Sequence, residues 1–273
     1  MTRTVSNRTL ATTVLLMLAV LIASVGVAGV QARTDRATGT EQTEANGDLP
    51  DQTADVRQLF AELTKEWPNN RTINVVFHGH SVPAGYHQTP QVKPFESYPF
   101  MVYQGLNTRF PTAVINSITT AIGGENSIQG AARFRRDVLS LQPDLLFIDY
   151  AINDQNLPLD MVESAWRDMI TMARRNHVPV VLLTPTGTVP NDLGNPTDPL
   201  SIRADLIRRL GQEYDLPVAD VSARWQETVD AGTPKESLLS QYYHPNEAGH
   251  RIAATEILST IDEMRADTRQ PAT

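Results

Sequence analysis

Two residues far apart in the chain have the types and settings of a nucleophile and its base. Ser81 lies in the Gly-flanked turn 78–85 (His-Gly-His-Ser-Val-Pro-Ala-Gly), directly after an apolar run, where a hydroxyl can be exposed at a sheet edge. His244 comes just before the helix-like C-terminal segment. A serine hydroxyl is a weak nucleophile until a neighbouring base accepts its proton. Taken singly, each is an ordinary turn or surface residue; brought together, the pair would attack acyl groups.

Alternating strand-like and helix-like segments would position these residues. The strand-like runs are short and apolar, each bounded by polar or Pro-containing stretches: 73–77, 113–118, 144–150, 178–183 and 216–221. Their alternation with helices predicts a three-layer α/β/α sandwich with a five-stranded parallel, flavodoxin-like sheet. In such a sheet, ligands bind beyond the carboxyl ends of the strands. Ser81 after the first strand and Asn153 after the third would therefore meet at one edge.

Apolar residues at helical spacing predict three of the helices. Their apolar faces are Val56, Leu59, Phe60 and Leu63; Val162, Ala165, Trp166, Met169, Ile170 and Ala173; and Ala254, Ile257, Leu258 and Ile261. Asp160 and Glu163 are placed like a capping box at the start of the second helix. His250 shares the apolar face of the last helix, so we expect it to be a packed histidine.

The order and spacing of four blocks resemble the SGNH (GDSL-type) serine hydrolase family. That family has a serine after strand one, a glycine after strand two, an asparagine after strand three and a late histidine. The matching blocks are 79–81 (Gly-His-Ser), 121–127 (Ala-Ile-Gly-Gly-Glu-Asn-Ser), 151–154 (Ala-Ile-Asn-Asp) and 244–250 (His-Pro-Asn-Glu-Ala-Gly-His). The histidine block is the most specific match, and the resemblance covers roughly residues 73–261.

The resemblance implies a catalytic role for each matching residue. Ser81 would be the nucleophile and His244 the base that takes its proton. The backbone N–H groups of Ser81 and Gly124 and the side-chain amide of Asn153 would form the oxyanion hole, with Gly123 as an alternative donor. Each such donor is worth about 3 to 4 kcal/mol of transition-state stabilisation.

Two positions depart from the family pattern. Gln241 stands where the family has Asp, three residues before His244, and an amide accepts a hydrogen bond but supplies no charge to an imidazolium. We therefore expect either a dyad or a more distant acid, of which Glu236 is the nearest upstream candidate. His80 also replaces an Asp. Because strands one and three are neighbours in a doubly wound sheet, we hypothesise that His80 pairs with Asp149 to support the nucleophile turn; otherwise it points to solvent.

These residues predict an exported serine ester hydrolase that acts through an acyl-enzyme on short-chain, especially acetyl, esters of carbohydrates. Aromatic rings with polar tips suit stacking on a sugar, unless they only pack half-buried; those expected near the site are Tyr86, His87, Phe95, Tyr98, Tyr242 and Tyr243. Two alternatives stay open. A polysaccharide O-acyltransferase would use a sugar hydroxyl in place of water, and Gln241 makes a catalytically impaired glycan-binding protein a serious candidate.

Neither a cofactor nor a metal is expected. Several histidines raise the alternative of a zinc hydrolase, because imidazoles are common zinc ligands: His78, His80, His87, His244 and His250. The carboxylates that usually complete such sites have no convincing spacing. The net charge of −8 disfavours nucleic acid as a partner, which leaves a small-molecule or glycan ester, and we expect a monomer.

The chain divides into a leader and one catalytic domain. An apolar run, Val14–Val30, ends in small residues that suit signal peptidase, so we expect residues 1–32 to be a signal peptide cleaved after Ala32. The product would be secreted or periplasmic, in contact with the membrane only transiently; an uncleaved run would anchor it instead. A polar, disordered linker is expected over 33–54, the hydrolase domain over 55–264 and a polar tail over 265–273. The sequence has no cysteine, which excludes disulfides and lipoprotein attachment.

Overall fold

The computed structural model describes residues 49–268, and every structural statement concerns that part of the chain. The predicted signal peptide, most of the predicted linker and the last residues of the tail lie outside it. Within residues 49–268, no helix has both the length and the hydrophobicity needed to cross a membrane.

A five-stranded parallel sheet forms the centre of the molecule. Its strands are β1 (Thr72–Gly79), β2 (Val114–Thr119), β3 (Leu145–Asp149), β4 (Val180–Leu183) and β5 (Val218–Ala219), in the spatial order β2-β1-β3-β4-β5. This order confirms the predicted flavodoxin-like sheet. β3, β4 and most of β1 are buried, which explains why their sequences are largely apolar rather than alternating.

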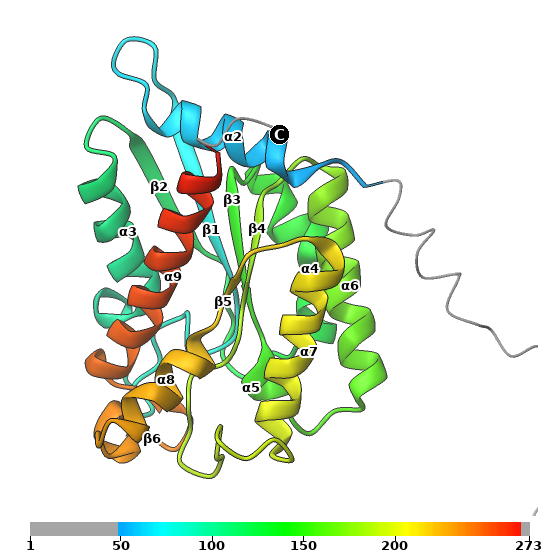
Figure 1. The fold of residues 1–273 in the computed structure, drawn as a ribbon, viewed down its shortest axis with the longest axis vertical. Helices are drawn as coiled ribbons and strands as arrows, with labels where there is room; N and C mark the ends of the chain where they lie inside the picture. Colours follow the sequence, from blue (N-terminus) through cyan, green and yellow to red (C-terminus); the bar gives the residue numbers. More distant parts are fainter. Residues whose placement is uncertain (1–48, 269–273) are drawn as a thin grey trace, which may run out of the picture. The chain divides into compact units, whose positions relative to one another are not determined.

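Helices cover both faces of the sheet (Figure 1). On one face α3 (Tyr98–Arg109) packs against α9 (Glu247–Asp267), which also contacts α8 (Val221–Asp230) and α2 (Gln52–Leu63). On the other lie α4 (Ser127–Asp137), α6 (Leu159–Arg175) and α7 (Pro199–Tyr214). The buried stripe of α6 contains the apolar residues predicted for it.

The structure corrects three local predictions. α2 begins at Gln52, inside the predicted linker, because the side chain of Asp51 caps it by accepting from Thr53 N, at 2.8 Å. The Gln52 amide group then ties this end of the helix to the backbone of Val180, at 2.9 and 3.3 Å. α9 continues to Asp267, beyond the predicted start of the tail at 265. The capping box predicted with Asp160 is absent, since α6 already begins at Leu159 after Pro158, without a side-chain cap.

The carboxyl ends of the strands meet the segments that carry the candidate residues. The turn after β1 contains Ser81, and the short helix α5 (Ala151–Asp154) follows β3. A small hairpin of β6 (Leu239–Gln241) and β7 (His244–Pro245) precedes α9. In Figure 1, α5 and β6 lie at the end of the sheet opposite α2.

Candidate active site

Ser81 and His244 are in direct contact although 163 residues separate them. The distance between Ser81 Oγ and His244 Nε2 is 3.0 Å. Ser81 is in the turn after β1, where its carbonyl accepts a hydrogen bond from Tyr86 N and Val82 O accepts one from Gly85 N. These bonds fold the turn back on itself and hold the serine at the edge of the sheet. The geometry is that of a nucleophile and its base.

The other ring nitrogen of His244 contacts a backbone carbonyl. His244 Nδ1 lies 2.9 Å from the carbonyl oxygen of His87. A carbonyl can only accept a hydrogen bond, so Nδ1 must carry the proton and Nε2 presents its lone pair to the Ser81 hydroxyl. Burial lowers the pKa of His244 below 6.5, which keeps the ring neutral at neutral pH.

The carbonyl of His87 therefore occupies the place of the expected carboxylate. The side chain of Gln241 makes no hydrogen bond to the imidazole of His244; its Oε1 accepts a hydrogen bond from the backbone N–H of Thr89, at 2.6 Å. Glu236 lines a cavity beside Gln241, and the suggestion that it holds the imidazole is wrong, because the single Nδ1 proton is directed to the carbonyl. Sequence reasoning missed this support, since any residue type can supply a backbone carbonyl.

The predicted oxyanion donors gather around the same edge. Among the described residues, the backbone N–H groups of Ser81 and Gly124 have no hydrogen-bond partner. Gly124 has φ +80°, a conformation that L side chains rarely adopt, and open space beside its Cα. Asn153 Nδ2 donates to the carbonyl of Glu125, at 2.8 Å, which uses one of its two amide protons and links α5 to the glycine turn.

A buried ion pair fixes the glycine turn from behind. Glu125 accepts hydrogen bonds from Arg133 Nε and Nη2, at 2.7 and 2.5 Å, and from the hydroxyl of Tyr150, at 2.8 Å. The side chains of Glu125 and Arg133 are only 8% and 9% exposed. Sequence reasoning had assigned neither residue a role. The sequence held a sign of this pair: Glu125 directly follows two glycines, and Arg133 comes later, in α4.

His80 and Asp149 are brought together, as hypothesised from strand adjacency. Gly79 and Asp149 are register partners on β1 and β3, and His80 Nε2 lies 3.3 Å from Asp149 Oδ1, within ion-pair distance but without hydrogen-bond geometry. His80 Nδ1 accepts from Val82 N, at 3.2 Å, so the proton of a neutral ring is on Nε2, toward the carboxylate. The alternative of a solvent-facing His80 is wrong, because the residue is fully buried.

The remaining histidines are dispersed. His78 is buried between Phe134 and Tyr150, and burial lowers its pKa to about 3. His250 is packed in α9, as predicted; its Nδ1 accepts from Tyr98 N, at 3.3 Å, and burial lowers its pKa to about 3. Within residues 49–268, no three His, Asp or Glu side chains converge as metal ligands.

Two of the six aromatic residues expected near the site are well placed to meet a ligand. Tyr242, 64% exposed, and Tyr243 directly precede the base. Tyr86 lies beside the base: its ring is 5.8 Å from that of His244 and packs on the Cα of Gly123. Tyr98 is 1% exposed and donates its hydroxyl to Asp149, at 3.0 Å, so the suggestion that it stacks on a sugar is wrong.

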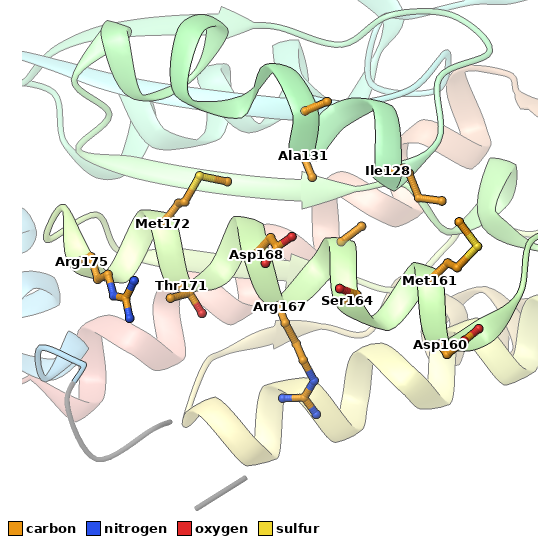
Figure 2. Close-up of a pocket in the computed structure, with 12 residues that line it drawn as sticks. Ile128, Ala131, Asp160, Met161, Ser164, Arg167, Asp168, Thr171, Met172 and Arg175 are labelled. Atoms are coloured by element: carbon orange, nitrogen blue, oxygen red, sulfur yellow. The ribbon is translucent and has the colours of Figure 1, made fainter. Parts of the chain in front are cut away.

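One cavity lies beside the hairpin that carries the base, whereas a larger one lies elsewhere. The first, about 530 Å³, is lined by Gln88, Thr89, Val189, Glu236, Leu239, Ser240, Gln241 and Tyr242. The second, about 750 Å³, runs between α4 and α6, and Figure 2 shows side chains of both helices around it. Its hydroxyls belong to Ser164 and Thr171, and no histidine lines it. In the described part of the chain, neither hydroxyl makes a hydrogen bond to a base there, whereas Ser81 contacts His244, so the chemistry is assigned to the sheet edge.

Comparison with known proteins points to ester hydrolases. The model of the GDSL-like Lipase/Acylhydrolase family matches residues 77–252. An acetylxylan esterase of Geobacillus stearothermophilus is 26% identical over 172 residues, which cover 57% of this chain and 76% of the relative.

Solved structures share the fold. A two-domain esterase active on acetylated mannans has a TM-score of 0.65 and 22% identity over 80% of this chain, which spans 55% of that protein's length. The structure of an acetylxylan esterase from G. stearothermophilus has a TM-score of 0.60 and 23% identity, over 69% of this chain and 94% of that one.

Proposed function

Because this chain belongs to the GDSL-like lipase/acylhydrolase family and is a carboxylic ester hydrolase, we propose that Ser81 and His244 carry out the hydrolysis. The observation that carries the proposal is the 3.0 Å contact between Ser81 Oγ and His244 Nε2, together with the carbonyl at Nδ1 that selects the productive tautomer. A serine held in this way loses its proton as it attacks, which is what activates a hydroxyl.

The first half of the reaction forms an acyl-enzyme. Ser81 Oγ bonds to the carbonyl carbon of the ester while its proton passes to His244 Nε2. The carbonyl oxygen becomes an oxyanion, which accepts hydrogen bonds from the N–H groups of Ser81 and Gly124 and from the remaining amide proton of Asn153. The carbon–oxygen bond to the alcohol then breaks, and the imidazolium returns the proton to the leaving oxygen.

The second half repeats these steps with water. His244 takes a proton from water, the hydroxide adds to the acyl carbon, and the same donors hold the second oxyanion. The bond to Ser81 Oγ breaks and the serine regains its proton from the imidazolium. The products are a carboxylic acid and free enzyme, and no step requires a cofactor.

The proposed substrate is a short-chain, acetyl ester of a carbohydrate. Two relatives that carry this fold are named for acetylated xylan and mannan, which favours this class. The polar cavity beside Gln241 and the exposed ring of Tyr242 suit a sugar better than a long acyl chain. Export is part of the proposal and rests on the signal-like sequence of residues 1–32.

The test combines one variant with a substrate series. Ser81→Ala should abolish hydrolysis of p-nitrophenyl acetate and prevent labelling by a phosphonate ester probe, while the melting temperature stays unchanged. Wild-type activity in this variant would overturn the assignment of the nucleophile. Release of acetate from acetylated xylan and mannan, measured beside p-nitrophenyl esters of increasing chain length, tests the substrate. A preference for eight carbons or more would reject the carbohydrate proposal and leave the assignment of Ser81 intact.

A further inference from the structure

The support of the catalytic base depends on a short exposed turn. His87, whose carbonyl contacts His244, begins the segment 87–91, which closes through His87 N to Gln91 O, at 3.0 Å, and Gln91 N to Gln88 O, at 2.8 Å. Residues 88–92 are exposed, so packing alone does little to fix this turn. An antiparallel bridge between Tyr86 and Val92 and the bond from Lys93 N to Gly85 O, at 2.7 Å, fix the shape of this hairpin, but not its position relative to the imidazole.

The hairpin that carries His244 supplies that restraint. Gln241, at the end of β6, is the register partner of His244 on β7. Its Oε1 accepts the backbone N–H of Thr89 at 2.6 Å, two residues beyond the supporting carbonyl. The base and the clamp on its support therefore belong to one hairpin, and a shift of the hairpin moves both together.

We infer that Gln241 is a positioning residue, whose side chain acts on the His244 imidazole through the 87–91 turn rather than by a direct hydrogen bond. Gln241 stands at the position of the usual Asp but does not hydrogen-bond the histidine. It holds instead the turn whose carbonyl, that of His87, makes this bond. This inference rests on the proposed Ser81–His244 chemistry. It differs from a merely structural role because it predicts an effect on the protonation and orientation of one ring.

The His87 carbonyl matters most to the reaction when the His244 ring is protonated. The Nδ1 hydrogen bond becomes charge-assisted once the ring takes the serine proton, and hydrogen bonds to charged groups are stronger than neutral ones. A carbonyl displaced from Nδ1 would also leave the ring free to adopt the other tautomer, whose Nε2 cannot accept that proton. Loss of the clamp should therefore lower kcat far more than it changes KM.

The experiment compares side chains that keep and lose the acceptor oxygen. With p-nitrophenyl acetate, Gln241→Leu and Gln241→Ala should each lower kcat about 10- to 100-fold, the loss expected for a charge-assisted hydrogen bond, with KM within about threefold. Gln241→Glu keeps an oxygen for Thr89 N and should recover most of that loss. The matched control is Gln91→Leu in the same turn, because within the described residues the Gln91 side chain makes no hydrogen bond. Its kcat should match the wild type.

A second measurement reports on the ring itself. The downfield proton NMR signal of His244 Nδ1–H should be present in the wild type and in Gln91→Leu, and shifted or lost in Gln241→Leu. Melting temperatures identify a variant that fails to fold. Wild-type kcat and an unmoved signal in both folded Gln241→Leu and Gln241→Ala would overturn the inference. Activity surviving in Ser81→Ala would instead overturn the proposed function, so the two failures are distinguishable.

Discussion

Replacing Asn153 with alanine tests the proposed oxyanion hole, in which this amide would have two tasks. One Nδ2 proton is bonded to Glu125 O, at 2.8 Å, and the other is available to the substrate oxyanion. Loss of an oxyanion donor costs about 2.7 to 4 kcal/mol, or about 10² to 10³ in kcat. Release of the Glu125 carbonyl also loosens the turn that presents Gly124, so Asn153→Ala should fall near the upper end of that range.

The two tasks are measured separately. Loss of the bond to Glu125 should cost about 1 kcal/mol of unfolding free energy, which lowers the melting temperature by about 2 to 4 °C. Steady-state kinetics with an aryl acetate gives kcat and KM, and thermal unfolding gives the stability. Asn116→Ala is a matched control. Asn116, exposed on β2, donates its Nδ2 to Asn74 Oδ1 on β1, at 3.2 Å, and its replacement should leave kcat unchanged. An effect of Asn153→Ala confined to KM would refute the reasoning and make Asn153 a substrate-binding residue.

Further predictions concern the base, the ion pair and pH. Gln241→Asp should lower kcat, because the shorter side chain loses Thr89 N while Nδ1 of His244 is already occupied by His87 O; a rise would show that the ring lacks support. Since burial lowers the pKa of His244, kcat/KM should be lost only as pH falls through a value below 6.5; an acidic limb above 6.5 would contradict this effect of burial on the base. Arg133→Met leaves the Glu125 carboxylate buried without its cation, so unfolding free energy should fall by about 3 to 5 kcal/mol and kcat should fall with it; unchanged denaturant midpoints would contradict this. His78 and His250 have folded pKa values of about 3 and an unfolded value near 6.5, so the unfolded chain binds more protons between these limits. Their contribution to stability should be complete above pH 6.5 and lost progressively as pH falls toward 3, and a melting temperature independent of pH over that window would exclude it.

The sequence predicted the features that depend on residue type and periodicity. Continuous apolar runs identify buried parallel strands, and the sheet order then places Ser81 and His80 next to the residues that follow β3. The pairing of His80 with Asp149 follows from the same argument, because Gly79 and Asp149 are register partners. These predictions succeeded because burial restricts which residue types a strand can contain, and strand adjacency determines which of them meet.

Features that depend on the backbone could not be predicted in this way. The His87 carbonyl supports His244, yet every residue has a carbonyl, so nothing in the residue types marks this one. Tyr98 resembles an exposed sugar-stacking ring in sequence, and only the fold reveals that it is buried with its hydroxyl on Asp149. The anchoring of α2 belongs to the same class, because Gln52 bonds the backbone of Val180, a partner far away in sequence. The start of α2, by contrast, has a local signal in Asp51, which caps the helix.

A carbonyl in place of a carboxylate separates two effects that an Asp would combine. It fixes the tautomer of His244 through its lone pairs, but it brings no full charge to stabilise the imidazolium. Burial lowers the pKa of His244 by more than the hydrogen bond to His87 O raises it, so the ring is a weaker base and, once protonated, a stronger acid than an exposed imidazole. A sugar alkoxide is a poor leaving group and departs only as it receives a proton, so a more acidic imidazolium favours its expulsion. The arrangement makes attack by Ser81 harder and departure of the alcohol easier, which suits a carbohydrate ester better than an activated one.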